Sequence, residues 1–368
     1  MTDVPANAPP PAAARVAVVV LNWNGLAFTR ACLRSLFAQT WPSLEIHVVD
    51  NGSRDDEAAA LCAEFGGRIR MHALPHNAGF TGGCNVAMQT VLAAGNCEFV
   101  ALLNNDAEAE VQWVEALVRE AGRDERTGLV ASRMCLFDEP DALDNAGVWL
   151  LSNGDVAPRG RLQRAASWNR ANDLLAACGG AVLLRCSMLR RIGLFRADFF
   201  ANFEDADLSL RAVVAGHRVR YAPDAVVRHH LNATIRRIRD TAFNVRSVRN
   251  ATWVFFVNLP LPVLLLDLPW FVLGNLAIVL LMPLCGRPAV AWAFVRGRLW
   301  ALRELPAIAA ERRRLRPLRA VSWWRLWCMQ RNFLWEYGRL VLLRVRGRRV
   351  GFMASAPAAA GARPPIRR

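Results

Sequence analysis

The chain has 368 residues, of which 54% are apolar, and it carries a formal net charge of +15. All 46 basic residues are arginines, and 19 of them follow residue 286, where only three glutamates oppose them, so the basicity belongs to the C-terminal part. The nine cysteines form no C-x-x-C pair and no regular spacing, which argues against a disulfide scaffold or a zinc site and fits a reducing compartment.

The first part of the chain alternates strand-like and helix-like segments. Residues 1–14 are rich in proline and alanine and lack a signal-peptide pattern, which predicts a disordered leader and a following domain that stays in the cytoplasm. The apolar patterns predict strands over 16–21, 45–49, 68–72 and 99–103, and helices over 27–39, 58–65 and 86–94. This order predicts an α/β fold with a mostly parallel sheet and flanking helices.

The run 99–103 is short and wholly apolar, as in a strand that is buried on both faces, and it leads into Asn104, Asn105 and Asp106. Ligands bind beyond the carboxyl ends of strands in open parallel sheets, so a ligand is expected there. The glycine-rich segment 77–85 precedes a helix and can offer backbone N–H groups to an anion, although a plain strand-to-helix connection explains it equally well. It matches neither the dinucleotide fingerprint nor the P-loop.

The second half contains a cluster of carboxylates. Residues 138–172 are loop-rich and are predicted to face a substrate, and a strand is predicted to begin after Gly179 and Gly180. Glu204, Asp205 and Asp207 then follow a group of phenylalanines. Acidic residues at a helix start can simply complement the helix dipole, and Asp207 has an i,i+4 partner in Arg211. The aromatic neighbours would instead raise the pKa of Glu204 or Asp205 and make either a usable base.

These residues resemble inverting family 2 glycosyltransferases of the GT-A fold, and most closely the bacterial rhamnosyltransferases that build cell-surface polysaccharides. The resemblance covers roughly residues 15–240 and implies a GT-A domain over 15–245. It rests on seven segments in this order: VVVLNWNG, VVDNGSRDD, NAGFTGGCN, LLNNDAE, CGGAVLL, FEDADLSLR and YAPDAVVRHH.

The resemblance implies a role for each segment. Contacts to the nucleotide sugar would come from Asn22, Asn24, Asp50, Asn77, Gly79, Asn85, Asn104 and Asn105. Asp106 stands at the D-x-D position, where it would hold Mg²⁺ or Mn²⁺ together with His229 and the substrate phosphates. Gly179 and Gly180 would lie near the donor sugar and the acceptor. Asp205, beside Glu204, would be the catalytic base.

The implied function is the metal-dependent, inverting transfer of a single sugar, rhamnose being one candidate, from a dTDP- or UDP-sugar to a lipid-linked or cell-surface saccharide. One carboxylate suffices because a metal, not a general acid, stabilises the leaving group, whereas a glycoside hydrolase needs two. The Q-x-x-R-W signature of processive synthases is absent, which indicates one sugar per encounter. One alternative is a nucleotidyltransferase, although its glycine-rich, basic N-terminal loop is missing. Another is an inert domain with a nucleic-acid-binding tail.

The C-terminal third points to a membrane rather than to nucleic acid. Residues 252–285 are apolar, with Asp267 as the only charged residue, and are long enough to cross a hydrocarbon core of ~30 Å. Prolines and Asp267 interrupt the run, which favours an interfacial or re-entrant helix pair over a single span, with core packing as a third interpretation. Residues 292–319 and 323–349 read as basic amphipathic helices for an anionic surface. We therefore expect a membrane-associating region over 246–350 at the cytoplasmic face of the bacterial inner membrane, and a disordered tail over 351–368.

Overall fold

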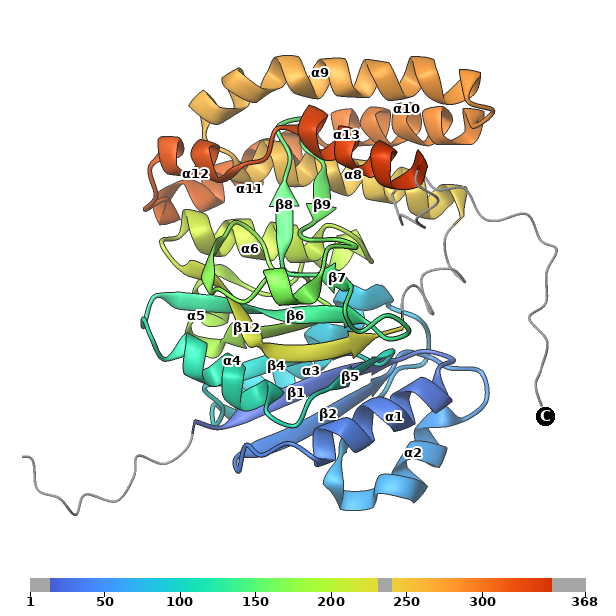
Figure 1. Ribbon diagram of the computed structural model, residues 1–368, viewed down its shortest axis with the longest axis vertical. Helices are drawn as coiled ribbons and strands as arrows, with labels where there is room; N and C mark the ends of the chain where they lie inside the picture. Colours follow the sequence, from blue (N-terminus) through green and yellow to red (C-terminus); the bar gives the residue numbers. More distant parts are fainter. Residues whose placement is uncertain (1–13, 231–239, 346–368) are drawn as a thin grey trace, which may run out of the picture.

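The computed structural model describes residues 14–230 and 240–345. The predicted tail, nearly all of the predicted leader and the end of the last predicted helix lie outside the described residues. An open sheet with its covering helices forms one part of the molecule, and a layer of C-terminal helices lies over one end of it (Figure 1).

The first half of the sheet is parallel, because β1 pairs with β2 and β4, and β2 pairs with β3. Its elements are β1 (Val16–Asn22), α1 (Leu26–Phe37), β2 (Leu44–Asp50), α2 (Glu57–Phe65), the 3-10 helix η1 (Gly66–Arg68), β3 (Arg70–Ala73), α3 (Gly79–Ala94) and β4 (Phe99–Asn104). Val18 of β1 packs in the same core as Leu33 of α1, and Val19 packs on the other face with Met88 of α3. Helices on both faces explain why these strands are continuously apolar.

The second half of the sheet contains both antiparallel and parallel pairings. Its elements are β5 (Ala107–Ala109), α4 (Trp113–Ala121), β6 (Thr127–Leu136), β7 (Leu143–Asn145), β8 (Val148–Leu150), β9 (Val156–Pro158), η2 (Ala165–Ser167), β10 (Asn172–Leu174), β11 (Ala181–Arg185), α5 (Cys186–Ile192), η3 (Ala197–Phe199), α6 (Glu204–Val214) and β12 (Arg218–His229). Within the described residues the sheet has ten strands in the order β10-β12-β6-β11-β4-β1-β2-β3, with β5 on β12 and β7 on β6. The predicted α/β fold with a mostly parallel sheet is confirmed.

The glycine-rich segment is the start of a helix and not the predicted loop. Helix α3 begins at Gly79, seven residues before the predicted start at residue 86. A Cβ atom on Gly83 would overlap Cδ1 of Leu21, and one on Gly79 would overlap the carbonyl oxygen of Phe200. The glycines therefore allow the helix to pack closely on β1 and on a distant loop, and those contacts leave no local pattern in the sequence.

The C-terminal layer consists of α8 (Thr241–Asn258), α9 (Leu261–Leu284), α10 (Pro288–Arg303), α11 (Leu305–Leu315), η4 (Arg316–Leu318), α12 (Trp323–Met329) and α13 (Phe333–Val345). The apolar run splits between two of them. Its first residues end α8, where Trp253, Val254 and Phe255 are buried, so core packing is correct for this part. The predicted boundary at residue 245 falls inside α8, and the division into two domains stays a prediction.

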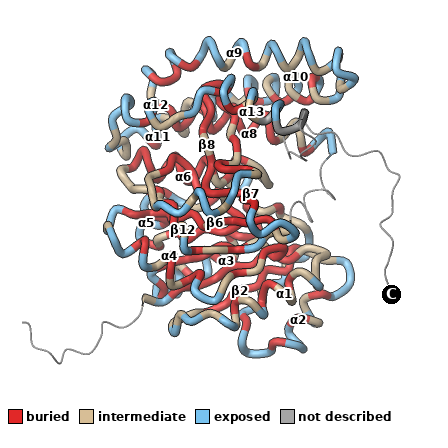
Figure 2. The backbone as a smooth tube through the Cα atoms, in the orientation of Figure 1, coloured by how far each residue is buried: buried red, intermediate tan, exposed pale blue. Residues whose placement is uncertain are grey.

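Helix α9 is a continuous helix of 24 residues, which corrects the predicted interruption near Asp267. Pro262 lies in the first turn, where a missing N–H costs nothing, and Pro269 removes a single backbone donor from a long helix. By length and composition, α9 is the one described helix that can cross a membrane. Its outer face is exposed along its length, as Figure 2 shows, and Leu265, Leu273 and Leu280 are 63%, 54% and 65% exposed.

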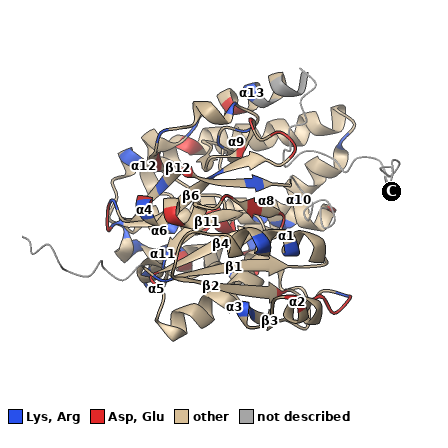
Figure 3. Ribbon diagram, turned by 60° about the horizontal axis from the view of Figure 1, so that its bottom comes forward, with Lys and Arg blue, Asp and Glu red and all other residues tan. Residues whose placement is uncertain are grey.

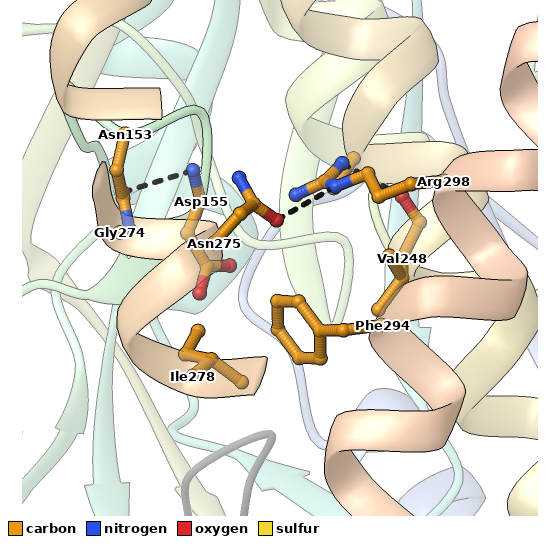
Figure 4. Close-up of a pocket in the computed structure, with 9 residues that line it drawn as sticks. Asn153, Asp155, Val248, Gly274, Asn275, Ile278, Phe294 and Arg298 are labelled. Atoms are coloured by element: carbon orange, nitrogen blue, oxygen red, sulfur yellow. Dashed lines mark hydrogen bonds between the residues drawn. The ribbon is translucent and has the colours of Figure 1, made fainter. Parts of the chain in front are cut away.

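A buried polar cluster joins the helical layer to the β8–β9 hairpin (Figure 4). Arg298 of α10 donates to Asn275 Oδ1 of α9 at 2.8 Å and to the carbonyl of Val248 in α8 at 3.1 Å. Asp155, in the hairpin turn, lines the same small cavity and accepts a hydrogen bond of 2.8 Å from Tyr337 of α13. Burial lowers the pKa of Arg298 to about 10 and raises that of Asp155. The bonds of Arg298 join α10 to α9 and α8, and the bond of Tyr337 attaches α13 to the hairpin.

Candidate active site

A cavity lies at the carboxyl ends of β1 and β4 and reaches the loop that precedes α6. It is lined by most of the residues expected from the sequence: Asn77, Gly79, Asn104, Asn105, Asp106, Gly179, Gly180, Glu204, Asp205 and His229. Asp106 and Asp205 are far apart in the sequence, and the sheet order brings them to one cavity because β11 pairs directly with β4. The start of β11 lies beside the end of β4, and Gly179, just before β11, bonds to Asp205 of α6.

Asn22 and Asp50, expected to contact a nucleotide, lie behind the cavity. The Asn22 side chain is fully buried, and its amide donates to Asp50 Oδ1 and Glu57 Oε2, both at 2.8 Å. Its oxygen accepts a hydrogen bond of 2.6 Å from the Thr29 hydroxyl. Asp50 also accepts a bond of 2.6 Å from the Ser53 hydroxyl. Both side chains satisfy buried polar groups of the protein itself and shape the loops after β1 and β2.

Asn24 and Asn85 do not line the cavity either. Asn24 has a left-handed backbone with φ of 51°, and its side chain accepts a hydrogen bond of 2.9 Å from the N–H of Arg54. Asn85 lies within α3 and bonds to both the N–H and the carbonyl of Phe195. Both amides bond to backbone groups of neighbouring segments. A sequence does not distinguish such an amide from one that binds a ligand.

Several cavity residues were missed by sequence reasoning: Leu21, Trp23, Asn51, Phe80, Cys178, Phe200, Ala201, Asn202 and Phe243. The sequence contained a signal for Asn51, because it follows Asp50 in a polar segment at the end of a strand. Its amide donates to Asn77 Oδ1 at 3.0 Å and its oxygen accepts from the N–H of Ala78 at 2.9 Å, so it orders the turn into α3. Phe243 belongs to α8, and nothing in the local sequence connects it with the cavity.

Asp106 and His229 face each other across neighbouring strands. His229 ends β12 and pairs with Ala107 of β5, so that its Nε2 lies 3.2 Å from Asp106 Oδ1. Its Nδ1 lies 2.7 Å from Asp144 Oδ2, and Asp144 forms a buried ion pair with Arg161. Burial by itself lowers the pKa of His229, but the hydrogen bonds to Asp106 and Asp144 raise it to about 10. Both carboxylates therefore favour a proton on this imidazole, which a metal ion bound at Nε2 would have to displace.

A carboxylate oxygen and an imidazole nitrogen are both ligands that divalent ions accept, and Asp106 Oδ1 lies 3.2 Å from His229 Nε2. Asp144 would then orient the imidazole ring from behind, as carboxylates commonly do for histidine ligands. Within residues 14–230 and 240–345, no group of three or more His, Cys, Asp or Glu side chains is arranged to hold a metal ion.

Glu204 and Asp205 begin α6 at the edge of the cavity. Asp205 accepts hydrogen bonds from the N–H groups of Gly179 at 3.0 Å and Ala206 at 2.7 Å, which orient its carboxylate. Oε2 of Glu204 is buried without a hydrogen-bond partner in the structure. Burial raises the pKa of both carboxyls, and the nearby charge of Asp205 raises that of Glu204 further. The pair can therefore take up a proton from a bound hydroxyl.

Asp207 is structural, in agreement with the predicted helical pair. Arg211 donates to its Oδ2 at 2.8 Å, and Asn258 of α8 donates to its Oδ1 at 3.0 Å. Both Asp207 and Arg211 are buried, and Arg211 also donates to the carbonyls of Ile192 and Leu194. This network ties α6 to the segment after α5 and to α8.

Comparisons with known proteins find similar sequences and a similar fold. Residues 17–193 match the family model for glycosyl transferase family 2. An N-acetylglucosaminyltransferase of Rhizobium meliloti is 27% identical over 245 residues, which cover 61% of this chain and 54% of the relative. A pre-mycofactocin glycosyltransferase of Mycobacterium tuberculosis is 30% identical over 226 residues, covering 60% and 44% of the two chains. The chain thus spans about half the length of the curated relatives it matches.

A solved structure shares the fold. The crystal structure of GalNAc-T7 with UDP, GalNAc and Mn²⁺ superposes with a TM-score of 0.53 at 14% identity, and the match covers 67% of this chain and 48% of that one. At this identity the likeness concerns the fold alone.

Proposed function

We propose that this protein transfers a sugar from a nucleotide-diphosphate sugar to an acceptor hydroxyl, because residues 17–193 match the family model for glycosyl transferase family 2 and the fold resembles the GT-A type, as the resemblance implied. The observation that carries the proposal is the convergence of Asp106 and His229 with Asp205 in one cavity. The first two suit a metal-bound diphosphate, and the third suits a base.

In the proposed reaction Asp205 accepts the proton of the acceptor hydroxyl as its oxygen attacks the anomeric carbon. The new glycosidic bond forms while the bond from that carbon to the diphosphate oxygen breaks, so one transfer inverts the anomeric centre. Bonds from Gly179 and Ala206 keep the Asp205 carboxylate aimed during this step. Asp106 and His229 would hold Mg²⁺ or Mn²⁺, which when bound neutralises the charge of the leaving diphosphate.

We extend the proposal to a dTDP- or UDP-sugar as donor, with rhamnose as one candidate sugar, and to a lipid-linked or cell-surface saccharide as acceptor. Trp23, Asn51 and Asn77 lie at the part of the cavity next to β1 and β2, where a base and ribose would fit. Gly180 keeps the cavity open, since a Cβ there would come within 3.0 Å of Asn104 Nδ2. UDP and Mn²⁺ in the GalNAc-T7 structure are compatible with this assignment.

A panel of nucleotide sugars tests the proposal. The purified chain should release nucleoside diphosphate from one donor class in the presence of Mn²⁺ or Mg²⁺, and EDTA should abolish the release. Failure to bind or consume any donor, with or without metal, would contradict it. Pyrophosphate release from a nucleoside triphosphate and a sugar phosphate would instead favour the nucleotidyltransferase alternative.

We also propose that the helical layer rests on the cytoplasmic face of the bacterial inner membrane as a peripheral attachment. Besides the leucines of α9, Trp292, Trp324 and Trp335 are 57%, 55% and 76% exposed, and arginines lie on the same helices (blue in Figure 3). Tryptophan and arginine beside apolar surface suit the lipid headgroup region. The carboxyl of Asp267 is buried against Trp327 and Gln330 of the α12 region and does not meet lipid.

An interfacial position of α9 is favoured over a span. At 1.5 Å per residue its 24 residues reach about 36 Å, enough to cross a membrane. However, α9 packs along α10 and α12, and Val263, Leu264 and Gly274 are buried, so the protein covers one side of it. A helix covered on one side and apolar on the other lies in the interface more readily than it crosses it.

Two charges on the exposed face of α9 should remove membrane binding. Leu273→Glu combined with Leu280→Glu is expected to weaken binding to phosphatidylglycerol-containing vesicles about tenfold or more, because both side chains would leave the apolar phase. Vesicle flotation measures the effect. Val111→Glu, at an exposed apolar position of the catalytic part, is the matched control. Unchanged binding of the double variant, or binding of oligonucleotides without binding of vesicles, would overturn the membrane proposal.

A further inference from the structure

The loop before the catalytic pair has an unusual backbone. Phe200 has φ of 63° and ψ of −61°, and the N–H of Ala201 donates to the carbonyl of Phe199 at 2.7 Å, which together define a classic γ-turn. Asn202 and Phe203 follow with φ of 70° each. Residues with a side chain rarely adopt these backbone conformations, so contacts with the surrounding protein must stabilise the loop. Glu204 and Asp205 come directly after it.

One buried side chain of α8 holds three carbonyls of this loop. The amide nitrogen of Asn250 lies 3.0 Å from the carbonyl oxygen of Phe199, 3.3 Å from that of Ala201 and 3.0 Å from that of Asn202. Asn250 is fully buried, and its two amide hydrogens are shared among the three acceptors. No other described side chain donates to all three carbonyls, so a single amide spans the γ-turn and the left-handed residue after it.

The orientation of the Asn250 amide is itself determined. Its oxygen accepts a hydrogen bond of 3.1 Å from Nη1 of Arg249, which leaves the NH₂ group toward the loop. Arg249 is held in turn by Glu304, between α10 and α11, at 2.7 Å and by Asp198 at 2.6 Å. A flipped amide would place an oxygen against three carbonyl oxygens, so the observed assignment is the one with satisfied partners.

Two further contacts from α8 reach the same loop. Asn202 donates to the hydroxyl of Ser247 at 2.9 Å, and the guanidinium of Arg246 lies 4.6 Å from the centre of the Phe200 ring. On the other side, the N–H of Thr81 in α3 donates to the carbonyl of Phe200 at 3.1 Å. The loop therefore lies between α3 and α8. The cavity is lined by three of its residues, Phe200, Ala201 and Asn202.

We propose that Asn250 is a positioning residue for catalysis: it holds the loop of residues 199–203 and thereby aims Asp205 at the acceptor. The inference rests on the proposed sugar transfer and adds that the C-terminal helix α8 completes the active site. Asn250 touches no reacting atom, and its effect passes through the backbone that leads into α6.

Asn250→Ala and Asn250→Asp test this assignment, with Asn258→Ala as the matched control. Asn258 is a buried asparagine on the same helix that bonds to Asp207 instead of the loop. Asn250→Ala should lower kcat about 10²-fold with KM for the donor within threefold, because a small misplacement of a catalytic group is that costly. Asn258→Ala should lower the melting temperature without this loss of turnover. The activity of Asn250→Asp relative to the unmodified chain should rise as pH falls, since only its protonated carboxyl can donate.

Hydrogen exchange provides a readout that does not depend on activity. Amides of the peptide covering residues 199–206 should exchange faster in Asn250→Ala than in Asn258→Ala. Faster exchange with normal turnover, or unchanged exchange, overturns the positioning role. An unmodified chain that consumes no donor but shows this exchange difference would contradict the proposed function while leaving Asn250 as the residue that holds the loop. Equal turnover losses in both alanine variants, in proportion to their melting temperatures, would show a merely structural role.

Discussion

Asp205→Asn should lower the rate of sugar transfer by about 10²–10⁴-fold, the range that a positioned general base contributes. The amide keeps the shape of the carboxylate, although it satisfies the N–H groups of Gly179 and Ala206 less well. It cannot take up the acceptor proton. Binding of the donor nucleotide should change little, because Asp205 acts on the acceptor. Rates at saturating donor and calorimetric nucleotide affinity measure the two effects separately.

The pH dependence follows from the same carboxyls. Burial raises the pKa of Asp205, so the acid limb of kcat should lie above the range of an exposed aspartate, with activity rising as pH rises through it. The contribution of this pair to stability should change in the opposite direction: both folded-state pKa values exceed the unfolded ones, so the contribution is fully present below the unfolded values and is lost as the pair ionises. Near-normal turnover of Asp205→Asn, together with an inactive Glu204→Gln, would move the base to Glu204.

Asp106→Asn is expected to remove the metal dependence of donor binding and to lower kcat/KM by about 10²–10³-fold, because a bound ion supplies several kcal/mol of charge stabilisation. Asp106 is the anionic member of the pair that fits the ion, and asparagine removes its charge at nearly constant shape. Titration of Mn²⁺ with and without nucleotide measures the loss. Mn²⁺-dependent nucleotide binding at normal affinity in this variant would show that the ion is held elsewhere.

Two companion measurements define the site around Asp106. Asp144→Asn should weaken Mn²⁺ binding about 10–100-fold, as expected for a residue that orients a histidine ligand from behind.

In the metal-free protein, Asp106→Asn should lower the pKa of His229, because one of the two carboxylates that stabilise its proton is lost. NMR titration of the imidazole detects this shift, and an unchanged pKa would mean that Asp106 does not contact His229.

Much of the fold could be predicted because the relevant signals are local. The β-branched run at 16–21 and the apolar run at 99–103 became β1 and β4, since a strand buried on both faces needs only a short apolar stretch. Asp106 lines the cavity because polar residues at strand ends gather at one edge of such a sheet, and Asp205 joins it from the first turn of α6. Asn22 ends β1 and Asn85 lies within α3, but both bond to the protein, and sequence cannot tell an amide that binds a ligand from one that satisfies a loop.

By itself, the sequence determined the order of strands and helices, the resemblance to family 2 glycosyltransferases and the carboxylates of the candidate site. These are properties of short segments, set by periodicity, burial and residue type. Only the tertiary structure decided that Asp144 supports His229, that Asn250 holds the loop before Asp205, and that the start of the apolar C-terminal run is core while α9 is exposed. Each of these depends on a contact between elements distant in the sequence. Such a contact exists only once the sheet and the helical layer have packed, so no local pattern records it.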